Sequence, residues 1–357
     1  MNHKERHPCR ERSLGVIGGL AALLALTAGP AMESAKAADA QPSWMKDAAL
    51  VAAARKEGEV TLISSLAEEV ALPQLHIFED ATGIKTNSVR GQNGSIMSRI
   101  TIENRANKQT WDSVELQVVD SLPKEWLSKF KPTEAAALVP DAKDPDDHWF
   151  GIYAVFNTPA YNTNLVKRDQ LPKSYEDLAK RADWAGHVAV LDDDRGWLAG
   201  LLGYYGEQKG RKLVQDIVDT IHPTLFKGHL ALARSLGSGE YWVALNNAVN
   251  FTLVQRASGD PTDFWVLDPV VTTYGEAAVN AKAPHPNAGK LLVNFLISRE
   301  AQLIRTKWNY IPTRGDVPTD PPGLLDAFAG KHLIPTKMAP NEDSKWQKTF
   351  NSYFKVD

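Results

Sequence analysis

Short apolar runs alternate with amphipathic stretches along most of the chain. Residues 59–64 and 84–89 have the length and composition of strands, and a helical stripe around Leu75 lies between them. Further strands are expected at residues 113–118 and 150–157, with a helix between them. This alternation of strand and helix patterns is typical of an α/β protein.

The same pattern continues to about residue 308. Ser43 is a predicted N-cap of a helix that runs to about Glu57. Other helices are expected at residues 95–106, after Ser174, and at residues 197–221, 286–295 and 301–308. The remaining predicted strands are at residues 187–191, 264–267 and 271–279. Beyond Asn309 the chain is rich in proline, which predicts irregular segments.

The first 40 residues have the pattern of a secretory signal peptide. Four basic residues precede residues 14–28, which carry no charge. Residues 38–40 read Ala-Asp-Ala, so we expect cleavage near Ala40 and a soluble mature chain in the periplasm. The apolar run is shorter than the roughly 20 residues that span a bilayer, and no later run is longer, so we expect no direct membrane insertion.

Charge and cysteine content limit the function classes of the mature chain. Cys9 lies in the leader, which leaves no cysteine for a disulfide, a thiol nucleophile or a thiolate metal site. The leader holds five of the 40 Lys+Arg and four of the 43 Asp+Glu, so residues 41–357 carry a net charge of −4. That charge argues against nucleic acid or an anionic membrane as partner. The length of the mature chain favours two domains.

The mature sequence contains none of the short motifs that mark common catalytic sites. Neither H-E-x-x-H nor C-x-x-C nor G-x-S-x-G occurs, and the glycine-rich patterns of nucleotide sites are absent too. We therefore expect a protein that is not an enzyme and that needs no cofactor.

Four stretches resemble the extracellular solute-binding proteins of the ferric-iron type of ABC importer. They are ARKEGEVTLISSL at residues 54–66, HIFEDATGIKTNSVRG at 76–91, YNTNLV at 161–166 and APHPNAGKLLVNFLISREAQ at 283–302. The last is the most specific, because a Pro-His-Pro helix start is followed by a helix, a Ser-Arg-Glu turn and another helix. The four stretches occur in the order found in the family.

The resemblance implies a type II periplasmic-binding-protein fold. Two α/β lobes are joined by two interlobe crossovers, and the ligand cleft lies between the lobes. The first lobe is expected to contain residues 41–152 plus 271–357, and the second lobe residues 153–270. In such a fold, closure of the lobes buries the ligand and changes the surface that meets the permease.

The resemblance also implies the function and the partner. A protein of this family captures a solute by lobe closure and delivers it to an inner-membrane ABC permease. We expect a monomer whose cargo is a small polar or anionic solute, either an organic acid or a phosphate-type anion. Two alternatives stay open: a ferric iron-binding transport protein of the same family, and a periplasmic ligand sensor for a two-component system.

Candidate ligand contacts in the first lobe lie where strands end. Ser64 and Ser65 end the first strand, where their hydroxyls can bond either a solute or only the local chain. Residues 90–95 join a strand to a helix, so backbone N–H groups near Gly94 and Ser95 can face an anionic ligand. The alternative is that Ser95 is an ordinary N-cap.

In the second lobe, residues 192–197 follow a strand and open a helix, a position that faces ligands in α/β proteins. Arg195 can pair with a carboxylate or phosphate, and Trp197 can stack on a ring or hydrocarbon face. Alternatively, the preceding aspartates hold Arg195, and Trp197 belongs to the core. The other candidates are Tyr153 and Asn157 on the first crossover strand, Tyr274 on the return strand, and Asn250.

A ferric site is not expected here. The resemblance implies that iron-binding relatives use neighbouring tyrosines, which suit a hard cation. The corresponding residues 244–253 read ALNNAVNFTL and contain no tyrosine. Tyr204 and Tyr205 are adjacent, but successive helix positions point about 100° apart, so we interpret both as structural. The acidic residues at 144–148 are interpreted as a solvated turn, and no metal is expected.

Overall fold

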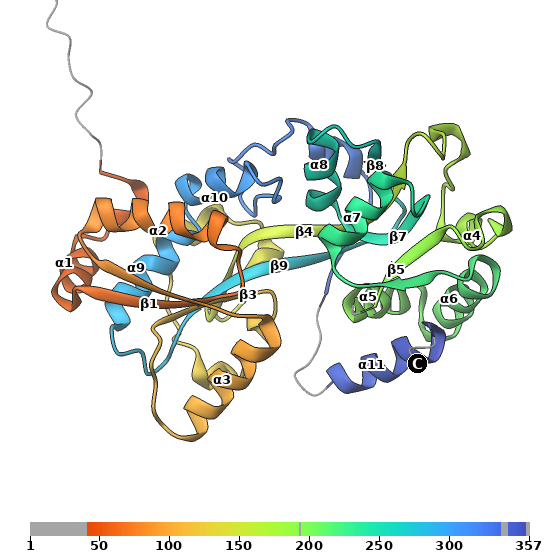
Figure 1. The fold of residues 1–357 in the computed structure, drawn as a ribbon. Coiled ribbons are helices and arrows are strands. Elements are labelled where there is room, and N and C mark those ends of the chain that lie inside the picture. Colours follow the sequence, from red (N-terminus) through yellow and green to blue (C-terminus); the bar gives the residue numbers. More distant parts are fainter. Residues whose placement is uncertain (1–40, 193, 337–341, 355–357) are drawn as a thin grey trace, which may run out of the picture. The chain divides into compact units, whose positions relative to one another are not determined.

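The computed structural model describes residues 41–192, 194–336 and 342–354 (Figure 1). The predicted signal peptide and Asp193 lie outside the described residues. Within the described ranges, strands and helices alternate as the hydrophobic pattern predicted.

Strands and helices of the amino-terminal region alternate as short units. The elements are α1 (Ala48–Glu57), β1 (Glu59–Ser64), α2 (Glu68–Thr82), β2 (Lys85–Arg90), α3 (Asn93–Arg105) and β3 (Ser113–Leu116). Gly58 and Gly83 end α1 and α2 with φ values of 77° and 72°. This left-handed conformation suits glycine and lets the next strand begin within two residues.

The middle of the chain begins and ends with a long strand. Its elements are β4 (Trp149–Asn162), α4 (Tyr175–Leu178), β5 (Val188–Leu191), α5 (Arg195–Tyr205), α6 (Glu207–Ile221), β6 (Thr224–Phe226), α7 (His229–Ser238), β7 (Val243–Ala248), α8 (Val249–Ala257), β8 (Thr262–Phe264) and β9 (Val270–Val279). The carboxyl-terminal part contains α9 (Pro286–Leu296), α10 (Arg299–Thr306), the 3₁₀-helix η8 (Leu324–Phe328), β10 (Leu333–Pro335) and α11 (Asp343–Phe354).

Two long antiparallel strands connect the two halves of the sheet. Among the described residues the strand order is β2-β1-β3-β9-β4-β7-β5-β6, with β10 beside β9 and β8 beside β4. One half is parallel except where β3 meets β9, and the other half is parallel except where β7 meets β4. Figure 1 shows β4 and β9 running side by side between the two groups of shorter strands.

Separate hydrophobic cores cover the two halves. In the amino-terminal half, one core packs α1, α2 and α9 on one face of the sheet around Phe78 and Phe295, and another packs α3 on the opposite face around Trp111. In the middle region, Trp184 and Trp197 are buried in a core that includes residues of α5 and α6. Each half therefore has its own buried apolar surface, as a structural domain requires.

Three sequence predictions about elements were wrong. The helix predicted from Ser43 begins instead at Ala48, because Asp47 accepts hydrogen bonds from the backbone N–H groups of Ala49 and Leu50. Ser43 starts a separate 3₁₀-helix (Ser43–Met45). Between β3 and β4 no α-helix occurs in the described residues, and the chain forms short 3₁₀-helices instead. Four prolines in this stretch interrupt a longer helix.

The third error concerns the tail, which is more regular than its prolines predicted. β10 adds a parallel strand beside β9, and α11 places Phe350 and Phe354 in the core of the middle region. The tail was assigned to the first lobe with residues 271–357. Its last helix nevertheless packs on α5 and α6. The lobe boundaries as a whole stay a prediction.

Candidate functional site

Parallel strands from the two halves end opposite the same stretch of β4. β3 ends at Leu116, opposite Glu276 of β9, and Glu276 in turn lies opposite Gly151 of β4. β7 runs the other way and ends at Ala248, opposite Asn157 of β4. The carboxyl ends of both sets of strands therefore point toward the middle of β4 and β9. Loops at carboxyl ends are where α/β proteins collect ligand-binding side chains.

Ser64 lies at this end of β1 and is tied to a carboxylate on the neighbouring strand. Its Oγ donates to Oε2 of Glu115 over 3.2 Å and accepts the backbone N–H of Leu66 over 2.9 Å. Ser65 donates its backbone N–H to the carbonyl of Glu115 over 3.1 Å. Sequence reasoning missed Glu115, although a charged residue inside an apolar strand was a visible signal.

Glu115 and Arg305 form a buried pair of opposite charges near the same strand end. Each is 1% exposed, and burial raises the pKa of Glu115 and lowers that of Arg305. Among the described residues, Oε1 of Glu115 and the Nε and Nη2 atoms of Arg305 have no hydrogen-bond partner. Buried polar atoms are nearly always paired, so these atoms stand out as ones that a water or a ligand group would have to satisfy.

Two tyrosines lie beside this charge pair. The rings of Tyr153 and Tyr310 have centroids 4.4 Å apart. Burial raises the pKa of Tyr153 well above its ordinary value and raises that of Tyr310 to about 12, so both phenols stay protonated at neutral pH. Tyr153 lies directly over Gly275, where a Cβ atom would come within 2.1 Å of its ring. The predicted residue Tyr153 therefore does join the cluster around Glu115.

Gly94 and Ser95 lie on the exposed first turn of α3. The helix begins at Asn93, two residues earlier than predicted, and Gln92 at the N-cap gives no side-chain hydrogen bond. Ser95 instead donates its hydroxyl to the carbonyl of Gln92 over 2.8 Å. The N-cap role considered for Ser95 is therefore wrong, and the first turn of α3 keeps backbone N–H groups without a side-chain cap.

The candidate ligand residues in the loop after β5 contact other parts of the protein. Asp194 caps α5 by accepting the backbone N–H of Trp197 over 3.1 Å. Trp197 is 2% exposed and its ring belongs to the core of the middle region. Arg195 donates a hydrogen bond from Nη1 to Oε1 of Gln347 in α11.

The turn between β7 and α8 carries a polar cluster that sequence reasoning mostly missed. Asn246 donates to Oδ2 of Asp194 over 2.7 Å, and Ala248 donates its backbone N–H to Nδ1 of His229 over 3.1 Å. Asn250 is buried in the first turn of α8, and its Oδ1 atom has no partner among the described residues. The run of asparagines between an apolar strand and a helix was the available signal.

Asn157 and Tyr274 lie on the two crossover strands. Asn157 is buried opposite Ala248, and its Oδ1 also has no partner in the described part of the chain. Tyr274 pairs with Ala154, and burial raises the pKa of its phenol to about 12. By strand register, Tyr153, Asn157 and Tyr274 share the central stretch, and Ser64 and Asn250 lie at its two sides.

The tyrosines considered for iron are engaged elsewhere. The Tyr205 hydroxyl donates to the carbonyl of Asp268 over 3.2 Å, and burial raises its pKa. Tyr204 contacts Nδ1 of His332 over 3.2 Å.

The acidic cluster of Asp144, Asp146 and His148 brings potential metal-ligand atoms within 4.8 Å of one another. The predicted solvated turn is present, with Pro145 and Asp146 exposed, but Asp144 itself is buried. The Nζ atom of Lys124 lies 2.9 Å from Asp144 and 2.6 Å from Asp146, so one ammonium group already pairs with both carboxylates.

Comparison with known proteins gives this arrangement a context. Residues 74–327 match the model of a family described as bacterial extracellular solute-binding protein. A periplasmic protein of Salmonella paratyphi A, whose name gives 2-aminoethylphosphonate binding as a provisional function, is 26% identical over 265 residues. These are 69% of this chain and 75% of that protein.

Solved structures show the same fold. Iron-bound HitA from Pseudomonas aeruginosa has a TM-score of 0.68 at 20% identity, and the match covers 82% of this chain and 99% of HitA. AfuA from Actinobacillus pleuropneumoniae, with fructose-6-phosphate bound, also has a TM-score of 0.68, at 18% identity, over 84% of this chain and 99% of AfuA. The predicted two-lobed α/β fold is confirmed.

The fold and the family match together define the class of protein. It is a solute-binding protein of a transport system. The chain belongs to the bacterial extracellular solute-binding protein family and is the solute-binding component of an ABC importer. Proteins of this class bind small solutes outside the cytoplasmic membrane and deliver them to an ABC permease. Within the described ranges, no helix has both the length and the apolar character needed to cross a membrane.

Proposed function

We propose that the protein binds a small organic anion of the phosphonate or phosphate type at the middle of β4 and β9. The observation that carries this proposal is the set of buried polar atoms without a described protein partner. They belong to Glu115, Asn157, Asn250 and Arg305. A bound solute can satisfy these atoms, whose burial without partners costs about 1–3 kcal/mol each.

The chemistry of this set favours a ligand with an anionic end. Arg305 offers two N–H-bearing atoms, Nε and Nη2, and Asn250 stands at the start of α8, where the helix dipole favours negative charge. Glu115 offers a carboxylate for an amino group of the same ligand. A zwitterion such as 2-aminoethylphosphonate, the compound in the name of the Salmonella relative, matches both charges.

Ferric iron fits the same residues less well. A hard trivalent cation prefers anionic oxygen ligands, and phenolates are the tyrosine form that binds it. Burial raises the pKa of Tyr153 and Tyr310, which opposes the phenolate form. Residues 244–253 supply asparagine amides in place of tyrosines. We therefore place the cargo among organic anions, although at least four of the structural neighbours are named as binding iron.

The remaining features complete the proposed receptor. We place signal-peptide cleavage near Ala40, the first lobe at residues 41–152 plus 271–357, and the second at 153–270, with α11 returning to the second. The ligand cleft lies between these lobes and closes on the solute. The protein acts as a monomer and performs no chemistry on its cargo. Of the predicted ligand contacts we retain Ser64, Ser65, Gly94, Ser95, Tyr153, Asn157, Arg195, Asn250 and Tyr274, and we add Glu115 and Arg305. Trp197 is not retained, because its ring belongs to the core of the middle region.

A thermal-shift panel on residues 41–357 tests the proposal. The ligands are 2-aminoethylphosphonate, ethylphosphonate, fructose-6-phosphate, inorganic phosphate, a dicarboxylate and ferric citrate. A ligand at 100 times its Kd stabilises the native state by about 2.7 kcal/mol, which raises the Tm by several degrees. We expect phosphonates or phosphates to give this shift. A shift with ferric citrate alone, accompanied by a coloured tyrosinate complex, contradicts the proposal.

Matched variants locate the response. Asn250→Ala removes a buried amide, and we expect it to weaken binding at least tenfold. Asn164→Ala is the control, because Asn164 is exposed and only its backbone atoms form hydrogen bonds among the described residues. Glu115→Gln should reduce the preference for 2-aminoethylphosphonate over ethylphosphonate, since only the former has an amino group. Equal binding by Asn250→Ala and wild type would place the solute elsewhere.

A further inference from the structure

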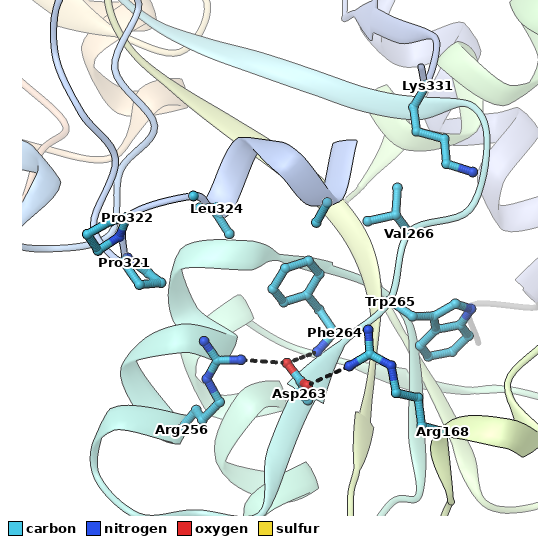
Figure 2. A pocket seen from close by; sticks show the side chains of 12 residues that line it. Arg168, Arg256, Asp263, Phe264, Trp265, Val266, Pro321, Pro322, Leu324 and Lys331 are labelled. Atoms are coloured by element: carbon cyan, nitrogen blue, oxygen red, sulfur yellow. Dashed lines mark hydrogen bonds and ion pairs between the residues drawn. The ribbon is translucent and has the colours of Figure 1, made fainter. Parts of the chain in front are cut away.

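One pocket of the protein lies apart from the proposed solute site, because none of the residues proposed to bind the solute lines it. Its volume is about 430 Å³, within the range of small-molecule sites. Figure 2 shows its lining side chains, which come from the end of α8, from β8 and the residues after it, from the loop at Arg168, and from the tail around η8. The pocket therefore joins the middle region to the tail.

One wall of this pocket is apolar and fixed by packing. The ring of Phe264 stacks on that of Phe328 at a centroid distance of 5.9 Å and an interplanar angle of 9°. Leu324 is buried in the same cluster. Trp265 is held in place because its Nε1 donates to the carbonyl of Pro172 over 3.1 Å. This wall offers a ligand a preformed hydrophobic surface.

The pocket also carries an excess of positive charge. Three cationic side chains and one carboxylate line the pocket: Arg168, Arg256, Lys331 and Asp263. Asp263 accepts a hydrogen bond from Nη1 of Arg256 over 2.8 Å and another from the backbone N–H of Phe264 over 2.9 Å. Among the three cations, Arg256 therefore forms the close ion pair with the Asp263 carboxylate.

Arg168 and Lys331, the other two cations, form no close ion pair of this kind among the described residues. Nη1 of Arg168 is 4.0 Å from Asp263, and the Arg168 side chain is 85% exposed. Such an exposed pair contributes little free energy. Lys331 is partly buried, and its positive charge contributes to lowering the pKa of Asp268. Figure 2 shows its side chain above Val266, at the opposite end of the view from Arg168 and Arg256.

We propose that this pocket is a second ligand site, which binds a small organic anion carrying an apolar group, such as an aryl carboxylate. The anionic group pairs with Arg168, the apolar group lies on Phe264, Val266 and Leu324, and Lys331 adds positive charge at the other end of the pocket. A bare inorganic anion uses only the charges, and a neutral hydrocarbon only the wall. Because β8 and the tail both line the pocket, the bound ligand cross-links them and stabilises the tail.

Fluorine NMR with 4-fluorobenzoate as the probe tests this site on residues 41–357. We expect saturable line broadening, and binding at least tenfold weaker for the neutral probe 4-fluorobenzamide. The double variant Arg168→Glu/Lys331→Glu should weaken 4-fluorobenzoate binding at least tenfold. Lys348→Glu, an exposed charge reversal on α11, is the matched control and should leave binding unchanged.

Each result either supports or overturns the second site. Absence of saturation at millimolar probe overturns it, and so does equal binding by the double variant and Lys348→Glu. Loss of the probe signal in Asn250→Ala, or its displacement by 2-aminoethylphosphonate, shows that the probe occupies the proposed solute site instead. If the solute panel fails but the probe binds and responds to Arg168→Glu/Lys331→Glu, the second site stands while the proposed cargo is wrong.

Discussion

Gln302 and Thr313 are joined by two buried hydrogen bonds of 2.8 Å each. Nε2 of Gln302 donates to the Thr313 hydroxyl oxygen, and the backbone N–H of Thr313 donates to Oε1 of Gln302. The same hydroxyl donates to the carbonyl of Gly151 over 2.8 Å. One amide thus fixes the start of the tail to α10 and, through Thr313, to the beginning of β4.

Gln302→Leu should therefore destabilise the protein. The leucine side chain occupies a similar volume but has no amide. The Thr313 backbone N–H is therefore left buried without its partner, at a cost of about 2 kcal/mol. Urea unfolding followed by circular dichroism gives the free energy of unfolding. Gln215→Leu is the control, because Gln215 is exposed on α6, and we expect its effect to stay within about 0.5 kcal/mol. Equal effects of the two changes would refute the buried role of Gln302.

Two glycine substitutions should have opposite signs. In Gly275→Ala the new Cβ meets the Tyr153 ring at 2.1 Å, so the ring or strand must shift, at a cost of about 1–3 kcal/mol. Gly203 lies in α5 with nothing within 4 Å of an added Cβ, and Gly203→Ala should stabilise the helix by about 0.5–1 kcal/mol. Thermal midpoints of the two variants, compared with wild type, measure both effects. A stable Gly275→Ala would show that Tyr153 is free to move.

The pH dependence of the free energy of unfolding should reveal the raised pKa of Glu276. Burial, with the nearby Asp120 charge, raises the pKa of Glu276 well above its ordinary value of 4.5. The folded state then binds a proton that the unfolded state has released. The contribution to stability is therefore complete below pH 4.5 and is lost as pH rises through the raised pKa.

Glu276→Gln removes this titration while Oε1 can still accept the Asp120 backbone N–H, which the wild-type Oε2 accepts over 2.8 Å. We expect the variant to gain stability relative to wild type between pH 5 and pH 8, as measured by urea unfolding at both values. Glu240→Gln, an exposed residue, should show no such trend. A difference between Glu276→Gln and wild type that does not change with pH would contradict the assignment.

Phe350 should be essential to the stability of the middle region. Its ring is fully buried and lies 4.6 Å, centroid to centroid, from that of Phe354. Phe350→Ala should cost about 3–5 kcal/mol by loss of apolar contact and creation of a cavity. Lys348→Ala, two residues earlier and exposed, is the control. Tryptophan fluorescence during denaturation reports on the core that contains Trp197. Similar midpoints for the two variants would show that α11 is not part of that core.

Hydrophobic periodicity predicted most of the fold but not its ends. Strands such as β1 and helices such as α9 have strong patterns with clear stop signals, so local chemistry located them well. The start of α1 was misplaced because Ser43 and Asp47 are both good caps, and only tertiary packing of Trp44 and Met45 selects between them. The same limit hid α11, whose apolar residues have a partner only in the folded middle region.

The candidate site was harder to predict for a physical reason. Ser64 was found because it ends a predicted strand, and Asn157 because it lies on the predicted first crossover strand. Asn250 was also among the candidates. Glu115 and Arg305 are 190 positions apart, and neither has a local motif. Their proximity depends on α10 packing against β4, which brings the Arg305 guanidinium to the carbonyl of Ile152 over 3.3 Å. Only the register of the assembled sheet shows that relationship.

The position of α11 also makes the core of the middle region depend on a distant part of the chain. The core around Trp197 includes Phe350, Tyr353 and Phe354, and Phe350 lies 153 positions along the sequence from Trp197. Contacts between residues so far apart form slowly, because the entropy of closing a long loop is lost before the contact is gained. The apolar surface of α5 and α6 is therefore covered by a long-range contact, and its burial is a late and rate-sensitive step of folding.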